Sequence, residues 1–324
     1  MKYLLIRQKH KRTKAIWETV GQKIPFETKV VDYRSPQSFR ELIASLKHHD
    51  FDRVIFDCNI RSIGRDYKLL KDVRNLIIYD NDLYHHFHPT SAYFGMFIAL
   101  FKTLMAHRII STGLYTVQNF QRAGLNVSYL PKSYDPDYVH FLDISKDIEV
   151  AFIGRTSNKI YRQRKKFLES LQKKLDVQII RTSEDDDYNK TLNKIRFFIS
   201  ADQGLNEFMA KNFEALAAGC ILCTVPTSEE EAGILGFEDM VNVVFYNSEQ
   251  ELISKIQYLK SNPDKADAIA LAGRQLAETR HQDQHRAAEM EKIIATPLLA
   301  PPVMRLRDRY DLFRLAAYHF VSRG

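Results

Sequence analysis

The segment Gly204–Thr224 (GLNEFMAKNFEALAAGCILCT) carries charged side chains in a pattern that could hold a phosphate ligand. It follows a strand-like run, FFIS, and its apolar spacing predicts a helix over Phe208–Ala218 that ends at a glycine. The first turn of such a helix exposes backbone N–H groups, which attract anions. Lys211 can add a positive charge to the same phosphates, and Glu214 can accept hydrogen bonds from a ribose diol. An amphipathic helix with Phe213 in the core and Glu214 in solvent would show the same pattern.

Elements that could position this segment recur along the chain. Short runs of Val, Ile and Leu alternate with helical patterns, which is typical of βαβ units around a parallel sheet. In the first half we expect strands at Tyr3–Ile6, Lys29–Val31, Arg53–Phe56, Leu76–Tyr79, Arg108–Ser111 and Ser128–Leu130. After a proline-marked connection the alternation restarts, with strands expected at Ile148–Ile153, Val177–Ile180, Phe197–Ser200, Ile221–Val225 and Val241–Phe245.

This alternation predicts an α/β fold of two doubly wound, Rossmann-like domains that face each other across a cleft. The predicted domains are residues 1–147 and 148–295, followed by a proline-bearing linker and a last helix in residues 296–324. Ligands of doubly wound sheets bind beyond the carboxyl ends of the strands. The apolar run over 92–106 contains Lys102 and is too short to span a bilayer, so we expect a buried helix there.

Composition narrows the class of protein. The 324 residues are 45% hydrophobic and 27% charged, which is typical of a folded globular chain. The formal charge of +7 favours an anionic partner: a nucleotide diphosphate, a phosphorylated lipid, a membrane face or nucleic acid. Three cysteines argue against an oxidising compartment, and the amino terminus has the pattern of a strand and basic loop instead of a signal peptide. We therefore expect a cytoplasmic location.

The second half resembles the C-terminal domain of the group 1 glycosyltransferases of the GT-B fold. In that family a basic residue, a Phe-Glu pair and a small-residue run ending in glycine precede a strand, as Lys211, Phe213-Glu214 and ALAAG do here. The segments VAFIGRTSNKIYRQRKKFLESL and SEQELISKIQYLKSNPDKADAIALAGRQLAETRHQDQHRAAEM are similar to that family's first strand with its basic helix and to its closing helices. The resemblance covers about residues 148–291.

This resemblance implies a donor site for a nucleotide-sugar, with no cofactor required. It would place Gly154 and Arg155 beside the phosphates, Arg164 as a second anion contact and Glu214 at the ribose. The other donor-binding candidates are Asn206, Lys211, Asn212 and Phe213. Many family members that retain anomeric configuration carry two glutamates spaced E-x7-E. Here Asn206 stands at the first position and Glu207 lies one residue out of register, so the sugar contact and the stereochemistry stay open.

The other half of the reaction needs a base that takes a proton from the acceptor hydroxyl. The segment NLIIYDNDLYHHFHPTSAYFG (Asn75–Gly95) follows a predicted strand and supplies several candidates. We expect Asp82 or His86 to be the catalytic base and Asp80, His85 and His88 to lie on the acceptor side. Surface histidines and an aspartate that caps a turn would explain the same residues.

Two acidic patterns also fit a metal site. Asp80-Asn-Asp82 and Asp185–Asp187 both spell D-x-D, the pattern that holds a divalent cation in the other glycosyltransferase fold, GT-A. The second pattern also suits a helix start. Because a GT-A fold would leave the 148–291 pattern unexplained, we expect a divalent metal to be dispensable and predict no metal ligands.

The last predicted helix, Arg305–Val321, carries one apolar stripe: Leu306, Tyr310, Phe313, Ala317 and Phe320. Arg305, Arg309 and Arg323 lie off that stripe. In GT-B enzymes a terminal helix commonly crosses back to pack on the N-terminal domain, which we favour. The alternative is a peripheral membrane helix whose arginines meet anionic headgroups. The basic loop Arg7–Lys14 could also meet a carrier phosphate.

Together these patterns predict a glycosyltransferase that moves a sugar from a nucleotide-sugar to a glycan or lipid-linked acceptor. The expected process is surface polysaccharide or lipopolysaccharide synthesis, at the inner face of the cytoplasmic membrane. A non-catalytic GT-B-like protein that only binds nucleotides is one alternative. A basic nucleic-acid-binding protein is another, although no helix-turn-helix, zinc-finger or aromatic RNA-binding motif is evident.

Overall fold

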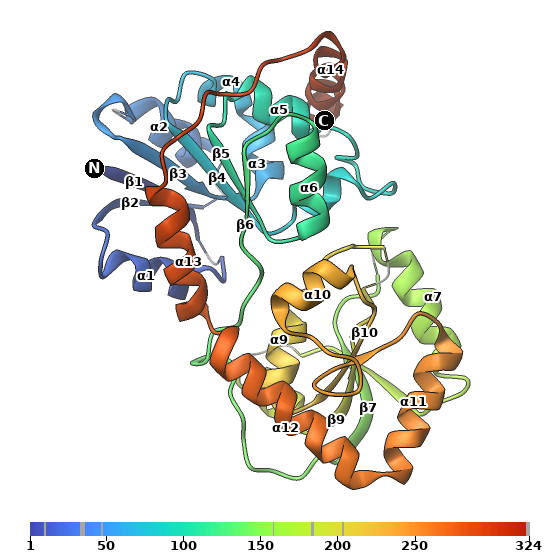
Figure 1. The fold of residues 1–324 in the computed structure, drawn as a ribbon. Helices are drawn as coiled ribbons and strands as arrows, with labels where there is room; N and C mark the ends of the chain where they lie inside the picture. Colours follow the sequence, from blue (N-terminus) through green and yellow to red (C-terminus); the bar gives the residue numbers. More distant parts are fainter. Residues whose placement is uncertain are drawn as a thin grey trace. The chain divides into compact units, whose positions relative to one another are not determined.

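A computed structural model describes residues 1–9, 11–32, 36–46, 48–157, 159–182, 185–202 and 204–321. It divides into two compact units, each drawn with its own sheet in Figure 1. The first unit comprises residues 1–131 together with the chain from Arg286 onward, and the second comprises Lys132–His285. The corresponding boundaries predicted from the sequence are 147/148 and 295/296.

The described part of the first unit holds a six-stranded parallel sheet in the order β2-β1-β3-β4-β5-β6. Its strands are β1 (Tyr3–Gln8), β2 (Phe26–Val31), β3 (Arg53–Asp57), β4 (Leu76–Asp80), β5 (Arg108–Ser111) and β6 (Val127–Tyr129). The strand order reverses between β1 and β3. At such a switch point the connecting helices leave to opposite faces, which opens a crevice at the carboxyl ends of the two strands.

Alternating side chains of this sheet enter two cores. Leu4 and Phe56 belong to one core, whereas Leu5 and Ile55 belong to the other, which also contains Trp17. The covering helices are α1 (Lys14–Gly21), α2 (Pro36–Ser45), α3 (Ile60–Arg65), α4 (Tyr67–Leu70), α5 (Phe97–Thr103), α6 (Leu114–Arg122), α13 (Asp283–Ala295) and α14 (Leu306–Val321). The buried helix expected over 92–106 is α5.

The described residues of the second unit form a five-stranded parallel sheet in the order β11-β10-β9-β7-β8. The strands are β7 (Ile148–Ile153), β8 (Val177–Ile180), β9 (Ile195–Ile199), β10 (Ile221–Thr224) and β11 (Val244–Phe245). The helices are α7 (Arg162–Leu171), α8 (Asp185–Asn193), α9 (Ala210–Ala217), α10 (Glu229–Leu235), α11 (Glu249–Ser261) and α12 (Pro263–Arg280). Here the order reverses between β7 and β9.

Two helices of the second unit differ from what the local sequence predicts. The sequence predicts a short helix at Thr191–Ile195, but α8 begins at Asp185 and Ile195 already belongs to β9. Helix α10 was not predicted. The start of α10 carries a capping box that the sequence shows. The side chain of Ser228 accepts from the backbone N–H of Glu231, three residues later.

The last helix, α14, contacts α5 and α3 of the first unit. Its inward face carries Leu315 and the buried Asp308, whose carboxylate pairs with Lys102 on α5 at 2.9 Å. The apolar stripe predicted from the sequence lies on the opposite face, and the side chain of Phe320 and the whole of Arg323 fall outside the described residues. No helix in the described ranges is long and apolar enough to cross a membrane.

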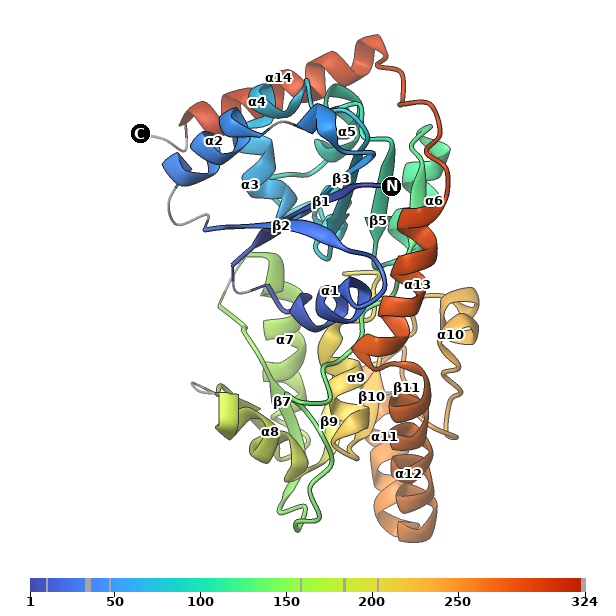
Figure 2. The same cartoon turned by 90° about the vertical axis from the view of Figure 1, so that its left-hand side faces the viewer.

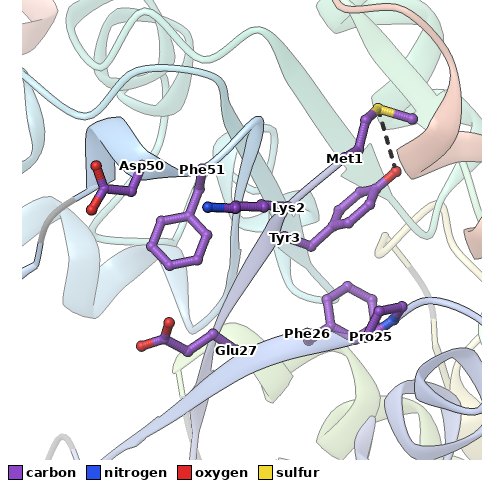
Figure 3. A pocket seen from close by; sticks show the side chains of 8 residues that line it. All are labelled: Met1, Lys2, Tyr3, Pro25, Phe26, Glu27, Asp50 and Phe51. Carbon is purple, nitrogen blue, oxygen red and sulfur yellow. Dashed lines mark hydrogen bonds between the residues drawn. The ribbon is translucent and has the colours of Figure 1, made fainter.

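A pocket of about 560 Å³ opens at the amino ends of β1 and β2 (Figure 3). Tyr3, Phe26 and Phe51 line it together with shorter and charged side chains. Parallel sheets bind their ligands at the carboxyl edge, so this pocket lies at the edge opposite to the one expected to carry chemistry.

Candidate functional site

The turn after β7 approaches helix α9 at the switch point of the second sheet. Gly154 leaves no room for a side chain, because an added Cβ would lie 2.7 Å from Cζ of Phe152 and 3.1 Å from Nζ of Lys211. The Lys211 ammonium donates to the carbonyl oxygen of Ile153 at 2.6 Å. The fold therefore brings the glycine turn after β7 next to the first turn of α9.

The glycine turn and the first turn of α9 form an electropositive region at the carboxyl edge of the second sheet. The first turn of α9 begins at Ala210 and presents backbone N–H groups, and the half-buried Lys211 lies in the same turn. The predicted phosphate contact Arg155 is exposed and follows Gly154 directly. An anionic group bound here would meet amides and cationic side chains together.

Arg164, predicted as a second anion contact, is buried and is held by the protein itself. Its Nε donates to the carbonyl oxygen of Ala201 at 2.8 Å, and Nη2 lies 2.5 Å from Oδ1 of Asp202. A third bond, at 3.3 Å, reaches the carbonyl oxygen of Arg155. Arg164 therefore links the loop after β7 to the loop after β9. Both loops border the predicted phosphate site.

We expect Arg164→Met to lower the free energy of unfolding by about 2–3 kcal/mol, because it leaves the largely buried Asp202 without its cationic partner. Urea denaturation followed by circular dichroism measures this loss. Lys165→Ala on the same helix is the matched control, since Lys165 makes only an exposed pair with Glu169, and it should change stability by less than about 0.5 kcal/mol. Equal effects of the two substitutions would contradict the role of Arg164.

Two other predicted donor residues are packing residues in this structure. Asn212 is fully buried on α9 and accepts from the Ser200 hydroxyl at 2.7 Å, while its amide lies 3.5 Å from the hydroxyl of Thr224. Phe213 lies in the core against Phe237. Asn212 holds α9 against the ends of β9 and β10, and Phe213 packs α9 against Phe237, which follows α10.

Glu214, predicted at the ribose, is only 3% exposed. The hydroxyl of Tyr188 on α8 donates a hydrogen bond to one oxygen of its carboxylate, and Tyr188 stacks on Tyr138 with ring centroids 5.6 Å apart. A hydroxyl group is thus already bound at the position where the sequence predicts a ribose hydroxyl.

Asn206 and Glu207, the two candidates for a contact with the sugar, lie ahead of α9 in different environments. Asn206 is exposed and has a left-handed backbone, with φ of 50°. Glu207 is buried and pairs with Lys132 at 2.5 Å. Lys132 was not anticipated, because nothing in a single sequence links it to a glutamate 75 residues away.

In the first unit, Asp80 is the last residue of β4 and Asp82 lies two residues beyond it. The Asp80 carboxylate is buried and accepts hydrogen bonds from the backbone N–H groups of Ile60 and Asp82. Burial raises the pKa of Asp80 to about 6, with Lys11 opposing the shift and Asp82 adding to it. Asp82 itself is half-buried, so it is the more accessible of the two carboxylates.

The three predicted histidines lie close together and are all buried. His86 accepts from the backbone N–H of Phe97 through Nδ1 at 3.0 Å, and burial lowers its pKa to about 3. His85 contacts the Ser91 hydroxyl at 3.0 Å, and His88 contacts Thr90 at the same distance. His86 is therefore neutral at physiological pH and serves the packing of the loop ahead of α5.

A polar cluster that the sequence analysis missed occupies the switch point between β1 and β3. Asp57, at the end of β3, pairs with Lys11 at 2.5 Å and accepts from Trp17 at 2.9 Å and from the Thr13 hydroxyl. Burial alone would lower the pKa of Lys11, but Asp57 and Asp80 raise it above its ordinary value. Lys11 lies in the predicted basic loop Arg7–Lys14, whose His10 falls outside the described residues.

Among the described side chains there is no group of three His, Cys, Asp or Glu residues suited to a metal ion, so Asp80-Asn-Asp82 forms no such group there. Both oxygens of Asp80 accept from backbone amides. The side chains of Asp185–Asp187 fall outside the described set.

Comparison with known proteins supports the resemblance found in the sequence. Residues 145–292 match the family described as glycosyl transferase-like. No curated protein matches by sequence.

Similar solved structures span nearly the whole chain. HepE of Anabaena, bound to UDP and glucose, has a TM-score of 0.63 at 14% identity and covers 91% of this chain and 99% of its own. Sucrose-phosphate synthase of Thermosynechococcus elongatus has a TM-score of 0.65 at 9% identity, with 90% and 98% covered. The DNA-modifying β-glucosyltransferase, solved with and without uridine diphosphoglucose, has a TM-score of 0.57 at 12% identity, with 91% and 100% covered. The predicted α/β fold of the GT-B glycosyltransferases is confirmed.

Proposed function

We propose that this chain, whose residues 145–292 form a glycosyl transferase-like domain, transfers a sugar from a nucleotide-sugar to a hydroxyl of a glycan or lipid-linked acceptor. The observation that carries the proposal is the convergence of Gly154, the first turn of α9 and Lys211 at the switch point of the second sheet. A diphosphate bound there would be stabilised by amides and an ammonium group as it leaves. UDP is the first nucleotide to test, because HepE and the DNA-modifying β-glucosyltransferase were solved with UDP or a UDP-sugar.

For a single-displacement transfer, we assign the base to Asp82. Its carboxylate would take the proton of the acceptor hydroxyl while the acceptor oxygen bonds to the anomeric carbon and the bond from that carbon to the diphosphate breaks. The half-buried position of Asp82 supports this assignment over His86. A histidine with a pKa of about 3 is a weak proton acceptor and is itself bonded to a backbone amide.

The sugar and acceptor contacts also remain proposals. Asn206 is exposed ahead of α9 and is the residue we place nearest the sugar, because Glu207 is occupied by Lys132. On the acceptor side we place the cluster at the β1/β3 switch point, where Lys11 pairs with the buried Asp57 and also feels the charge of Asp80. We further propose a cytoplasmic location at the inner membrane face, and a role in surface polysaccharide or lipopolysaccharide synthesis.

Thermal denaturation of the full chain with UDP, GDP, ADP, dTDP and CMP, with and without magnesium, tests the proposal. One nucleoside diphosphate at about a hundred times its Kd should stabilise the protein by about 2.7 kcal/mol, without needing magnesium. No stabilisation by any nucleotide would refute the donor site. Nucleotide binding without release of nucleotide from a panel of sugar donors and acceptors would favour a non-catalytic binding protein. Salt-sensitive binding to random oligonucleotides in place of nucleotides would favour the nucleic-acid alternative.

A further inference from the structure

Helix α14 exposes several of its apolar side chains to solvent. Leu306 is 82% exposed, Tyr310 67% and Phe313 69%, and Ala317 is exposed as well. Their spacing of four, three and four residues puts them on one side of the helix. Leu299 and Val303, in the segment leading into α14, are also exposed. We call the four helix positions the outer stripe.

The rotation of α14 that exposes this stripe is set by contacts on its other side. Asp308 forms the buried pair with Lys102, and its carboxylate also accepts from the backbone N–H of Arg305 at 2.6 Å. Leu315 and His319 contact the region of Gly64, where an added Cβ would lie 3.4 Å from His319 and 3.7 Å from Leu315. Turning the outer stripe inward would break a buried ion pair, which costs several kcal/mol.

Positive charge borders the outer stripe on both sides. At 100° per residue, Arg307 and Arg314 fall on one flank and Arg309 on the other. The two acidic residues of the helix offset only part of this charge. Asp308 is buried against Lys102 and lies 4.0 Å from Arg307, and Asp311 pairs with Arg314, whereas Arg309 is exposed. Helix α14 contacts α5 and α3 and lies at the surface of the first unit (Figure 2).

From this arrangement we infer that the outer stripe of α14 docks on an anionic lipid surface. The aromatic and aliphatic side chains enter the boundary between headgroups and acyl chains, and the flanking arginines contact lipid phosphates. A second copy of the chain fits the same surface poorly, because a two-fold contact across the stripe would bring arginine flanks against arginine flanks. The inference rests on the proposed membrane-face location but not on the donor chemistry.

Flotation of the full chain with vesicles tests this inference. The vesicles are phosphatidylcholine alone, or phosphatidylcholine with an equal part of phosphatidylglycerol. We expect binding to the anionic vesicles that weakens at high salt. The substitution pairs Tyr310→Ser with Phe313→Ser and Arg307→Gln with Arg309→Gln should each lower the partition coefficient about tenfold or more.

The matched control is Tyr258→Ser with Leu271→Ser, which replaces two similarly exposed apolar residues on α11 and α12 of the second unit. This variant should bind vesicles like the wild type. Equal binding to neutral and anionic vesicles, or unchanged binding of the outer-stripe variant, would overturn the inference. A wild-type dimer that the outer-stripe variant makes monomeric in equilibrium sedimentation would overturn it too. Nucleotide stabilisation, measured on the same variants, should be unchanged, so a failed donor site and a failed docking surface are distinguishable.

Discussion

Replacing Glu214 by alanine should raise the Kd for the nucleoside diphosphate about a hundredfold. Ribose hydroxyls bonded to a buried carboxylate form charge-assisted hydrogen bonds, each of which contributes about 1.5–3 kcal/mol. In the structure the Tyr188 hydroxyl donates to this carboxylate. We expect the ribose to bind at that carboxylate in competition with Tyr188. Isothermal titration calorimetry measures the change.

Tyr188→Phe separates the ribose role of Glu214 from a purely structural one. It removes the competing hydroxyl and keeps the ring that stacks on Tyr138, so nucleotide affinity should stay within about threefold of the wild type. Glu214→Gln, which retains volume and one acceptor oxygen, should fall between wild type and Glu214→Ala. If Tyr188→Phe and Glu214→Ala weaken nucleotide binding equally, Glu214 serves only to hold α8 against α9.

Asp82→Asn should lower kcat about a thousandfold. An amide keeps the size of the side chain but cannot accept the proton of an acceptor hydroxyl, and general base catalysis typically contributes a hundredfold to ten-thousandfold. Nucleotide affinity should not change, because the proposed donor site is built from residues of the second unit. Turnover with saturating donor, followed as nucleotide release, measures kcat.

Asp72→Asn is the control for Asp82→Asn. Asp72 is an exposed aspartate of the turn that leads into β4, so it lies at the opposite end of the same strand. We expect wild-type kcat from this variant. A wild-type kcat for Asp82→Asn would remove Asp82 from the mechanism.

Because His86 is buried with its pKa near 3, His86→Gln should lower stability while kcat per folded molecule is kept.

Several features of this protein could be read directly from local sequence. The strands β5, β7 and β8 have the predicted bounds, because short runs of Val and Ile between turn residues have few other stable conformations. Helix α9 and its closing Gly219, which has φ of 70°, were predicted for the same kind of local reason. The order of these elements also implied a parallel sheet whose carboxyl edge carries the ligand.

Only the tertiary structure decided which side chains are available to a ligand. Arg164 has the same local pattern as its exposed neighbour Lys165, but Asp202 and the carbonyl of Ala201 lie in another loop, and they hold its guanidinium inside the protein. His86 is likewise placed by a backbone N–H eleven residues away.

For the last helix, too, the sequence predicted the pattern of side chains and the tertiary structure decided their orientation. Its 3.6-residue period identified the apolar stripe from sequence alone, but a period does not say which face turns inward. The buried pair between Lys102 and Asp308, 206 residues apart, decides it, and it leaves Tyr310 and Phe313 facing outward. Local periodicity therefore determined the elements of this protein, whereas contacts between distant residues determined which of their faces can meet a substrate or a membrane.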